Sequence, residues 1–250
     1  QPLSNIESFL YMNIVCLKWG TKFSHEHVNR LYKMVKKNFT HNFKFICYTE
    51  NSSQINEEIK IYPLKQEYDL EKWWWKLTLF ENIADEPTMF LDLDIVIQRD
   101  ISNYISLCDD NKIRTIKAYW KPHARNLKPQ SPGYDMDLNS SVMIWKGDCT
   151  QVWKEFYDQP DYFMCKYQGM DSYLYFHHKN ILNFFPKKEI YSRLHGMDEK
   201  QMWWYESKKN LFYDENYKIC IFNKWKMDKP FGGEGIDDDA YIGFEKYWSD

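Results

Sequence analysis

Two aspartates stand in an otherwise apolar run of this 250-residue chain. The run reads TMFLDLDIVIQ over residues 88–98, and one residue separates Asp92 from Asp94. Because alternate side chains of a strand point to the same face, this spacing predicts that both carboxylates share one face of a buried strand. Two like charges there repel each other and are costly to desolvate, so they need either a compensating cation or the open end of the strand. Mg²⁺ or Mn²⁺, held by carboxylate oxygens and completed by a diphosphate, meets that need.

The elements that must position these aspartates alternate between strands and helices. Apolar runs rich in β-branched and aromatic residues predict strands at 12–17 and 43–48, a weaker strand at 59–62, and another at 139–145. Between the first two strands, Ser24 is a suitable N-cap, and apolar residues recur at helical spacing to about residue 37. The alternation predicts an α/β fold with a parallel sheet.

Three consecutive tryptophans precede the aspartate run. Asp69 can cap a helix in which Trp73 and Trp74 belong to an apolar stripe that faces the core. At about 100° per residue, Trp75 falls opposite that stripe and Lys76 on its flank, so these two are expected to face a cleft.

Composition narrows the classes of protein. With 44% hydrophobic and 28% charged residues, and only 9 Gly and 9 Pro, the chain is globular rather than disordered or fibrous. A net charge of -3 is too weak a field to hold a polyanion, so we expect no nucleic-acid partner. The aromatic content of 18% is high, and we expect most rings in the core and some against sugar rings.

The expected cellular context follows from what the sequence lacks. It has no apolar run long enough to cross a bilayer and no secretory signal pattern, so we expect a cytoplasmic chain, reduced cysteines and chance matches to the N-glycosylation pattern. We expect residues 1–11 to be an N-terminal extension and residues 12–250 to form a single domain. The Pro-rich segment between residues 120 and 137 predicts a long loop that covers or shapes a binding site.

Asp92-Leu93-Asp94 matches the D-x-D motif of the GT-A fold glycosyltransferases, in which that motif holds the metal and diphosphate of a nucleotide-sugar donor. The chain resembles this family over roughly residues 12–230. The other matching segments, in family order, are Lys18-Trp19-Gly20 at the nucleotide-binding start, Trp75-Lys76 in a W-x-K-L element, Asn139-Ser140-Ser141-Val142-Met143 in an N-S-[SG]-V-M strand, and Pro186 with Tyr191-Ser192.

The resemblance implies a GT-A-like α/β fold with a mixed, mostly parallel central sheet flanked by helices. It implies transfer of a sugar from a nucleotide-diphosphate donor, foremost a UDP-sugar, to a hydroxyl of a glycan or other acceptor, with Mn²⁺ or Mg²⁺ as cofactor. The implied metal ligands are Asp92, Asp94 and Asn223, the last at the position of a family histidine. The implied donor-binding set is Lys18, Trp19, Gly20, Lys76, Asp92, Leu93, Asp94, Asn139 and Ser140.

The implied catalytic residues are Asp94, Asp171 and Lys229. Lys229, which precedes Pro230, adds positive charge at the leaving diphosphate, as does Lys76. Relatives commonly carry a G-D-Q stretch near the acceptor, where this chain reads Gln168-Gly169-Met170-Asp171. Asp171 is the candidate base of an inverting reaction, whereas in retaining relatives the leaving phosphate can take the proton. The motif order favours retention of configuration.

Two other classes of protein fit part of the sequence. The run FLDLDIVI also matches the haloacid-dehalogenase-like phosphatases, with Asp92 as nucleophile and Asp94 as general acid. In that family, however, the motif normally follows the first strand. A sugar- or nucleotide-binding relative without turnover is the other alternative, suggested by Met170 and Asn223.

Overall fold

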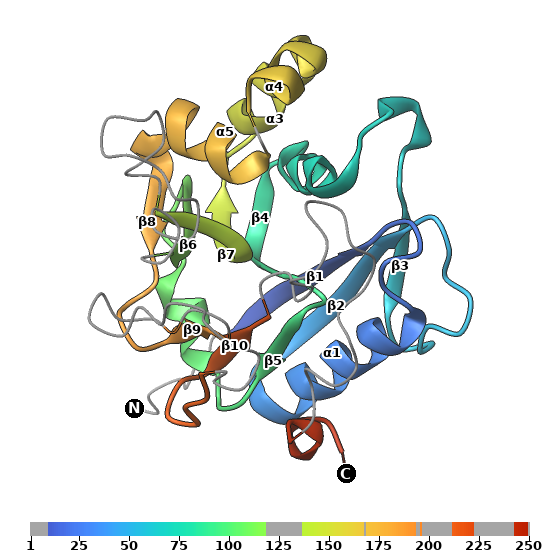
Figure 1. Cartoon of the computed structure of the whole chain (residues 1–250), viewed down its shortest axis with the longest axis vertical. Coiled ribbons are helices and arrows are strands. Elements are labelled where there is room, and N and C mark those ends of the chain that lie inside the picture. Colours follow the sequence, from blue (N-terminus) through green and yellow to red (C-terminus); the bar gives the residue numbers. More distant parts are fainter. Residues whose placement is uncertain are drawn as a thin grey trace, which may run out of the picture.

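The computed structural model of the chain describes residues 10–118, 137–167, 169–193, 196, 212–222 and 243–249. Its centre is a 7-stranded sheet with the order β3-β2-β1-β4-β7-β6-β8 (Figure 1). A 3-stranded sheet with the order β5-β10-β9 accompanies it. No helix among the described residues has both the length and the apolar character needed to span a membrane.

The strands of the large sheet are β1 (Tyr11–Lys18), β2 (Asn42–Thr49), β3 (Lys60–Pro63), β4 (Ala84–Leu91), β6 (Lys112–Lys117), β7 (Leu138–Gly147) and β8 (Leu182–Phe184). Those of the small sheet are β5 (Ile95–Ile97), β9 (Ile190–Ser192) and β10 (Ile219–Ile221). The α-helices are α1 (His25–Asn38), α3 (Gln151–Asp158), α4 (Pro160–Lys166) and α5 (Met170–His177).

The large sheet is mixed and mostly parallel, which confirms the predicted fold class. β1 runs parallel to both of its neighbours, β2 and β4. β7 runs antiparallel to both β4 and β6, while β6 and β8 are parallel. Because β7 is reversed, its first residues lie beside the last residues of β4.

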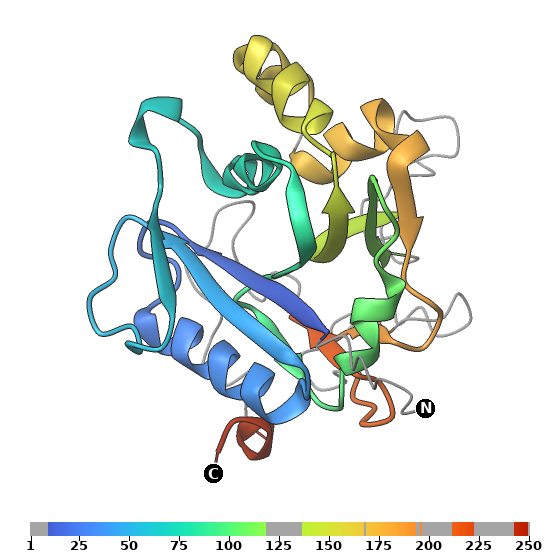
Figure 2. The ribbon, with the colours of Figure 1, turned by 180° about the vertical axis from the view of Figure 1, so that it is seen from behind.

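Two hydrophobic cores cover the two faces of the large sheet. Along β1, Ile14 and Cys16 point to one core, and Val15 and Leu17 point to the other. The first core is closed by α1 and the small sheet, and α1 runs alongside β1 and β2 in both views (Figure 1 and Figure 2). The second core is closed by α3, α4 and α5, which lie at the far end of the molecule from α1.

The prediction of an α-helix over residues 69–80 is wrong in the type of helix and in which side chains it buries. Asp69 adopts a left-handed conformation (φ 47°), and a 3-10 helix covers Lys72–Phe80. Such a helix has about three residues per turn, so side chains three apart line up. Trp74 therefore lies in one buried row with Leu77 and Phe80.

The same change of period decides the position of Trp75. Its side chain is buried in the second core, so the expectation that it faces a cleft is wrong. Trp73 and Lys76, three residues apart, form a partly exposed row of the 3-10 helix instead.

The aspartate run is also not one continuous strand. β4 ends at Leu91 and β5 begins at Ile95, so Asp92, Leu93 and Asp94 form the turn between two sheets. The two carboxylates are thus at the open end of a strand, which was one of the two arrangements that their charge allows.

The segment over residues 119–136 lies outside the description, but its two ends are adjacent. The backbone N–H of Ala118 donates a hydrogen bond to the carbonyl of Asp137 at 2.5 Å. Beside it, the Lys117 ammonium lies 3.3 Å from the Asp137 carboxylate. The residues at which the chain leaves and re-enters the sheet are therefore in direct contact.

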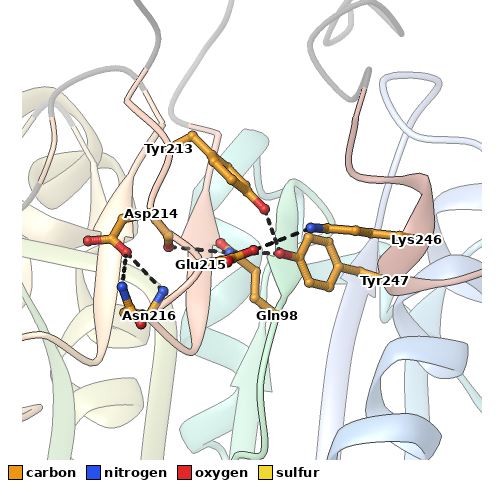
Figure 3. Close-up of polar contacts among 7 residues, drawn as sticks. All are labelled: Gln98, Tyr213, Asp214, Glu215, Asn216, Lys246 and Tyr247. Carbon is orange, nitrogen blue, oxygen red and sulfur yellow. Dashed lines mark hydrogen bonds and ion pairs between the residues drawn. The ribbon is translucent and has the colours of Figure 1, made fainter.

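The C-terminal residues 243–249 return to the small sheet and α1. Figure 3 shows the polar part of this contact, in which Gln98 donates hydrogen bonds to the Tyr247 hydroxyl (3.2 Å) and the Asp214 carbonyl (3.3 Å). The hydroxyls of Tyr213 and Tyr247 lie 2.8 Å apart. On the other side, the Arg30 guanidinium lies 4.6 Å from the ring of Trp248.

Candidate functional site

Asp92 lies at the carboxyl end of β4, where the start of β7 meets it. Leu91 pairs with Val142 across the two strands, and the backbone N–H of Asp92 donates to the Ser141 carbonyl at 2.9 Å. This bond continues the β4–β7 pairing by one residue and fixes the backbone that carries the carboxylate.

Lys76 reaches the same point from the 3-10 helix. Its ammonium lies 2.7 Å from Oδ2 of Asp92 and 5.1 Å from the centroid of the Phe90 ring. The two charged side chains are only 13% and 21% exposed, so this ion pair is screened less than a surface pair. Two of the predicted site residues, 16 positions apart in sequence, are thus in direct contact.

Asp94 is half-buried on the other side of the turn. Its carbonyl accepts a hydrogen bond from the N–H of Phe222 at 2.9 Å, which ties the turn to the end of β10. Burial, and next the negative charge of Asp92, raise the pKa of the Asp94 carboxyl group to about 6. The positive charges of Lys22 and Lys76 lower that pKa in part.

Lys22 was not identified from the sequence. It follows β1 in the loop to α1, and nothing in its local pattern distinguishes it from other lysines. Its relation to Asp94 arises because β1 and β4 are adjacent parallel strands, so the segments that follow them leave the sheet at the same edge.

Asp171 and Ser140 meet at a second point of the site. Asp171 lies in the first turn of α5, and its Oδ1 accepts a hydrogen bond from the backbone N–H of Ser140 at 3.1 Å. The side chain of Asn139 accepts one from the N–H of Ser141 at 3.0 Å. The start of β7 therefore links Asp171 to the carbonyl of Ser141, to which Asp92 is bonded.

The start of α5 is held in place by the 3-10 helix. Gly169 precedes α5, and a Cβ atom added there would overlap the indole ring of Trp73. The contact between the Trp73 ring and the Gly169 backbone joins the 3-10 helix that carries Lys76 to the start of α5, which carries Asp171. The sequence alone did not predict this contact.

The predicted nucleotide-binding start lies at the end of β1. Lys18 is buried, and its ammonium lies 3.4 Å from the carbonyl of Asn51, which follows β2. Gly20 has a φ of 61°, which favours glycine, and its N–H donates to the Glu50 carboxylate. Trp19 is partly buried against the second core, and Leu93 is buried in the first.

Two predicted residues, Asn223 and Lys229, lie outside the described residues. Among those that are described, no three His, Cys, Asp or Glu side chains come together as a metal site. The two carboxylates that do come together fit a hard divalent cation, which can take further oxygen ligands from a diphosphate and water. Burial and the negative charge of Asp92 disfavour the ionised form of Asp94, and a bound cation would offset both costs.

Comparison with known proteins was made by sequence and by structure. No family model and no curated protein matches the sequence. The fold is similar to that of the galactosyltransferase LgtC, solved with donor and acceptor sugar analogues, with a TM-score of 0.56 and 12% identity over 94% of this chain and 93% of that one.

Two further solved structures are similar at the same level. The apo-form glycosyltransferase GlyE of Streptococcus pneumoniae has a TM-score of 0.56 and 12% identity over 95% of this chain and 60% of that one. The bifunctional glycosyltransferase WbbM has a TM-score of 0.58 and 8% identity over 90% of this chain and 47% of that one.

Proposed function

We propose that this chain, which has the GT-A glycosyltransferase fold, transfers a sugar from a nucleotide-diphosphate donor, foremost a UDP-sugar, to an acceptor hydroxyl. One observation carries the proposal. Asp92, Asp94 and Lys76 lie together at the carboxyl end of β4, and Asp171 is linked to them through the start of β7. In α/β sheets, ligands bind at such carboxyl ends.

In this proposal Asp92 and Asp94 hold a divalent cation, Mn²⁺ or Mg²⁺, and Asn223 is its third protein ligand. When bound, such a cation supplies positive charge to the departing diphosphate. Phe222 donates its backbone N–H to the carbonyl of Asp94, so the end of β10 is joined to the turn that carries the two aspartates.

The protein's own residues provide the rest of the chemistry. The anomeric carbon becomes cation-like while the leaving diphosphate gains negative charge, so lysines near the phosphates stabilise the transition state. Lys76 and Lys229 serve that role, and Lys18, Trp19, Gly20 and Leu93 shape the donor end of the site. Asn139 and Ser140 offer hydrogen bonds to sugar hydroxyls.

Asp171 lies beside the transferred sugar in this assignment. Its carboxylate, of which Oδ1 accepts a hydrogen bond from Ser140, has the capacity to accept one from a sugar hydroxyl as well. We assign retention of configuration, with the acceptor proton passing to the leaving phosphate, as the motif order favours.

The phosphatase alternative is not favoured. Its nucleophile would follow the first strand, whereas Asp92 follows β4, after a complete β1–α1–β2–β3 unit. The folds to which this chain is similar are those of glycosyltransferases.

Calorimetric titration with UDP, GDP and CDP, each with and without Mn²⁺, tests the proposal. We expect UDP to bind tightly only when Mn²⁺ is present, and we expect Asp94→Ala to remove that dependence. Lys36→Met is the matched control, since Lys36 pairs with Glu58 on an exposed surface. If none of the three nucleotides binds in the presence of Mn²⁺, the proposed function is wrong.

A further inference from the structure

The carboxylate assigned to a metal ion already has a cationic partner from the protein. Oδ2 of Asp92 lies 2.7 Å from the ammonium of Lys76, within the range of a strong charge-assisted hydrogen bond. The Lys76 ammonium and a metal ion cannot both contact Oδ2 at such distances, because two cations in direct contact with one oxygen atom repel each other.

The surroundings of Lys76 favour this ion pair in the absence of a ligand. The ammonium lies over the Phe90 ring, two residues before Asp92 on β4, and the whole group is largely removed from solvent. Breaking the pair without a replacement leaves two partly buried charges unpartnered, which is costly.

We propose that Lys76 competes with the divalent cation for Asp92, and that the diphosphate of the nucleotide relieves this competition by giving the ammonium another anionic partner. The inference rests on the proposed function and adds an order to it: the metal ion binds weakly until the nucleotide is present. Metal and nucleotide therefore bind cooperatively, with Lys76 as the positioning residue that couples them.

The extent to which Lys76 weakens metal binding depends on the fraction of ligand-free molecules in which its ion pair with Asp92 is broken. The apparent dissociation constant of the metal ion is its intrinsic value divided by that fraction. If the ion pair is broken in about one molecule in ten, the metal ion binds about tenfold more weakly than it would to a free Asp92. Because coupling is reciprocal, the metal ion strengthens nucleotide binding by the same factor.

A second lysine separates this competition from the simple repulsion between cations. Lys22 also places positive charge near the pair, as its effect on the pKa of Asp94 shows, but no hydrogen bond or ion pair joins it to Asp92 or Asp94 among the described residues. Removing the Lys22 charge therefore measures only the through-space repulsion between a lysine and the metal ion. Removing the Lys76 charge measures that repulsion together with direct competition for Asp92.

The experiment measures Mn²⁺ binding from the electron paramagnetic resonance signal of the free ion, first without and then with saturating UDP. The proteins are the wild type, Lys76→Met, Lys76→Arg and Lys22→Met. Without UDP, we expect Lys76→Met to bind Mn²⁺ about tenfold more tightly than the wild type. Lys22→Met should gain clearly less, and Lys76→Arg, which keeps a cation beside Asp92, should gain nothing.

With UDP present, we expect the advantage of Lys76→Met over the wild type to disappear. Equal gains for the two methionine variants, or no gain for Lys76→Met without UDP, would overturn the competition while leaving the proposed function intact. If the wild type does not bind Mn²⁺ even with UDP, the metal site itself is wrong, and both proposals fail.

Discussion

At the scale of single residues, the site is a set of charges that the fold holds in an unfavourable arrangement. Asp94 is half-buried beside another carboxylate, and its pKa is raised for those two reasons. Such a group lowers the stability of the folded protein when it is ionised. A bound cation would offset this cost by neutralising the charge.

Replacing Asp94 by Asn should stabilise the folded protein at neutral pH. The pKa of this carboxyl group is raised from 3.8 to about 6, so its ionised form is disfavoured in the folded state. We expect Asp94→Asn to raise the free energy of unfolding by about 3 kcal/mol near pH 7.5. The difference should shrink as the pH falls from about 6 to about 4 and vanish at about pH 3, where the wild-type carboxyl group is largely neutral in both states. Urea denaturation at several pH values measures it, and a constant difference across this range would contradict the assignment.

Replacing Asp171 by Asn should separate catalysis from donor binding. The amide oxygen can still accept the hydrogen bond of Ser140, so the fold and the affinity for UDP should be kept. We expect the turnover number for sugar transfer to fall by about 10-fold or more, because the neutral amide is a weaker hydrogen-bond acceptor for the transferred sugar than the carboxylate. An equal loss of UDP affinity would instead place Asp171 at the nucleotide.

At the scale of elements, the sequence predicted what local periodicity determines. β1, α1 and β2 were predicted within one or two residues, because α1 has apolar residues at helical spacing and the two strands are short apolar runs rich in β-branched and aromatic residues. The helix at the three tryptophans was not, because a short apolar pattern fits either 3.6 or 3.0 residues per turn until a packing partner selects one.

Local sequence patterns could not predict the contacts between elements. Asp92 and Lys76 were both singled out, but their direct ion pair depends on how the 3-10 helix lies against the end of β4. The contact of Asp171 with Ser140 depends on the reversed direction of β7. Lys22 was missed for the same reason, since only strand adjacency brings it near Asp94.

The contact between Trp73 and Gly169 gives a test at this scale. Gly169→Ala adds a methyl group against the indole ring, so either the 3-10 helix or the start of α5 must shift. We expect a loss of about 1–3 kcal/mol in the free energy of unfolding. Trp73→Ala in the same chain should recover part of it, because the overlap then disappears. A double-mutant cycle measured by urea denaturation checks this, and strictly additive effects would show that the two positions are independent.

At the scale of the whole molecule, the C-terminal segment closes the first core near the site. Phe244 is 1% exposed and its ring contacts Phe222, whose N–H is bonded to the carbonyl of Asp94. The end of the chain is thereby two contacts away from the proposed metal ligands.

Removing the Phe244 ring should therefore lower global stability. We expect Phe244→Ala to cost about 3 kcal/mol or more, as for other large buried aromatic side chains. Ile83→Ala is the control, since Ile83 is 55% exposed and its loss should change stability by about 0.5 kcal/mol at most. Thermal and urea denaturation compare the two, and equal effects would show that the C-terminal segment does not belong to the cooperative unit.

The contact between Ala118 and Asp137 has a consequence for how the length of this chain can be changed. A hydrogen bond and an ion pair fasten the two ends of residues 119–136 together at the sheet, so the sheet does not depend on the span between them. We therefore expect sequences of different length inserted between Ala118 and Asp137 to leave the sheet intact. Such insertions would end immediately before the strand that carries Asn139 and Ser140, so they would change the surface beside the proposed site while the elements that hold Asp92 and Asp94 stay the same.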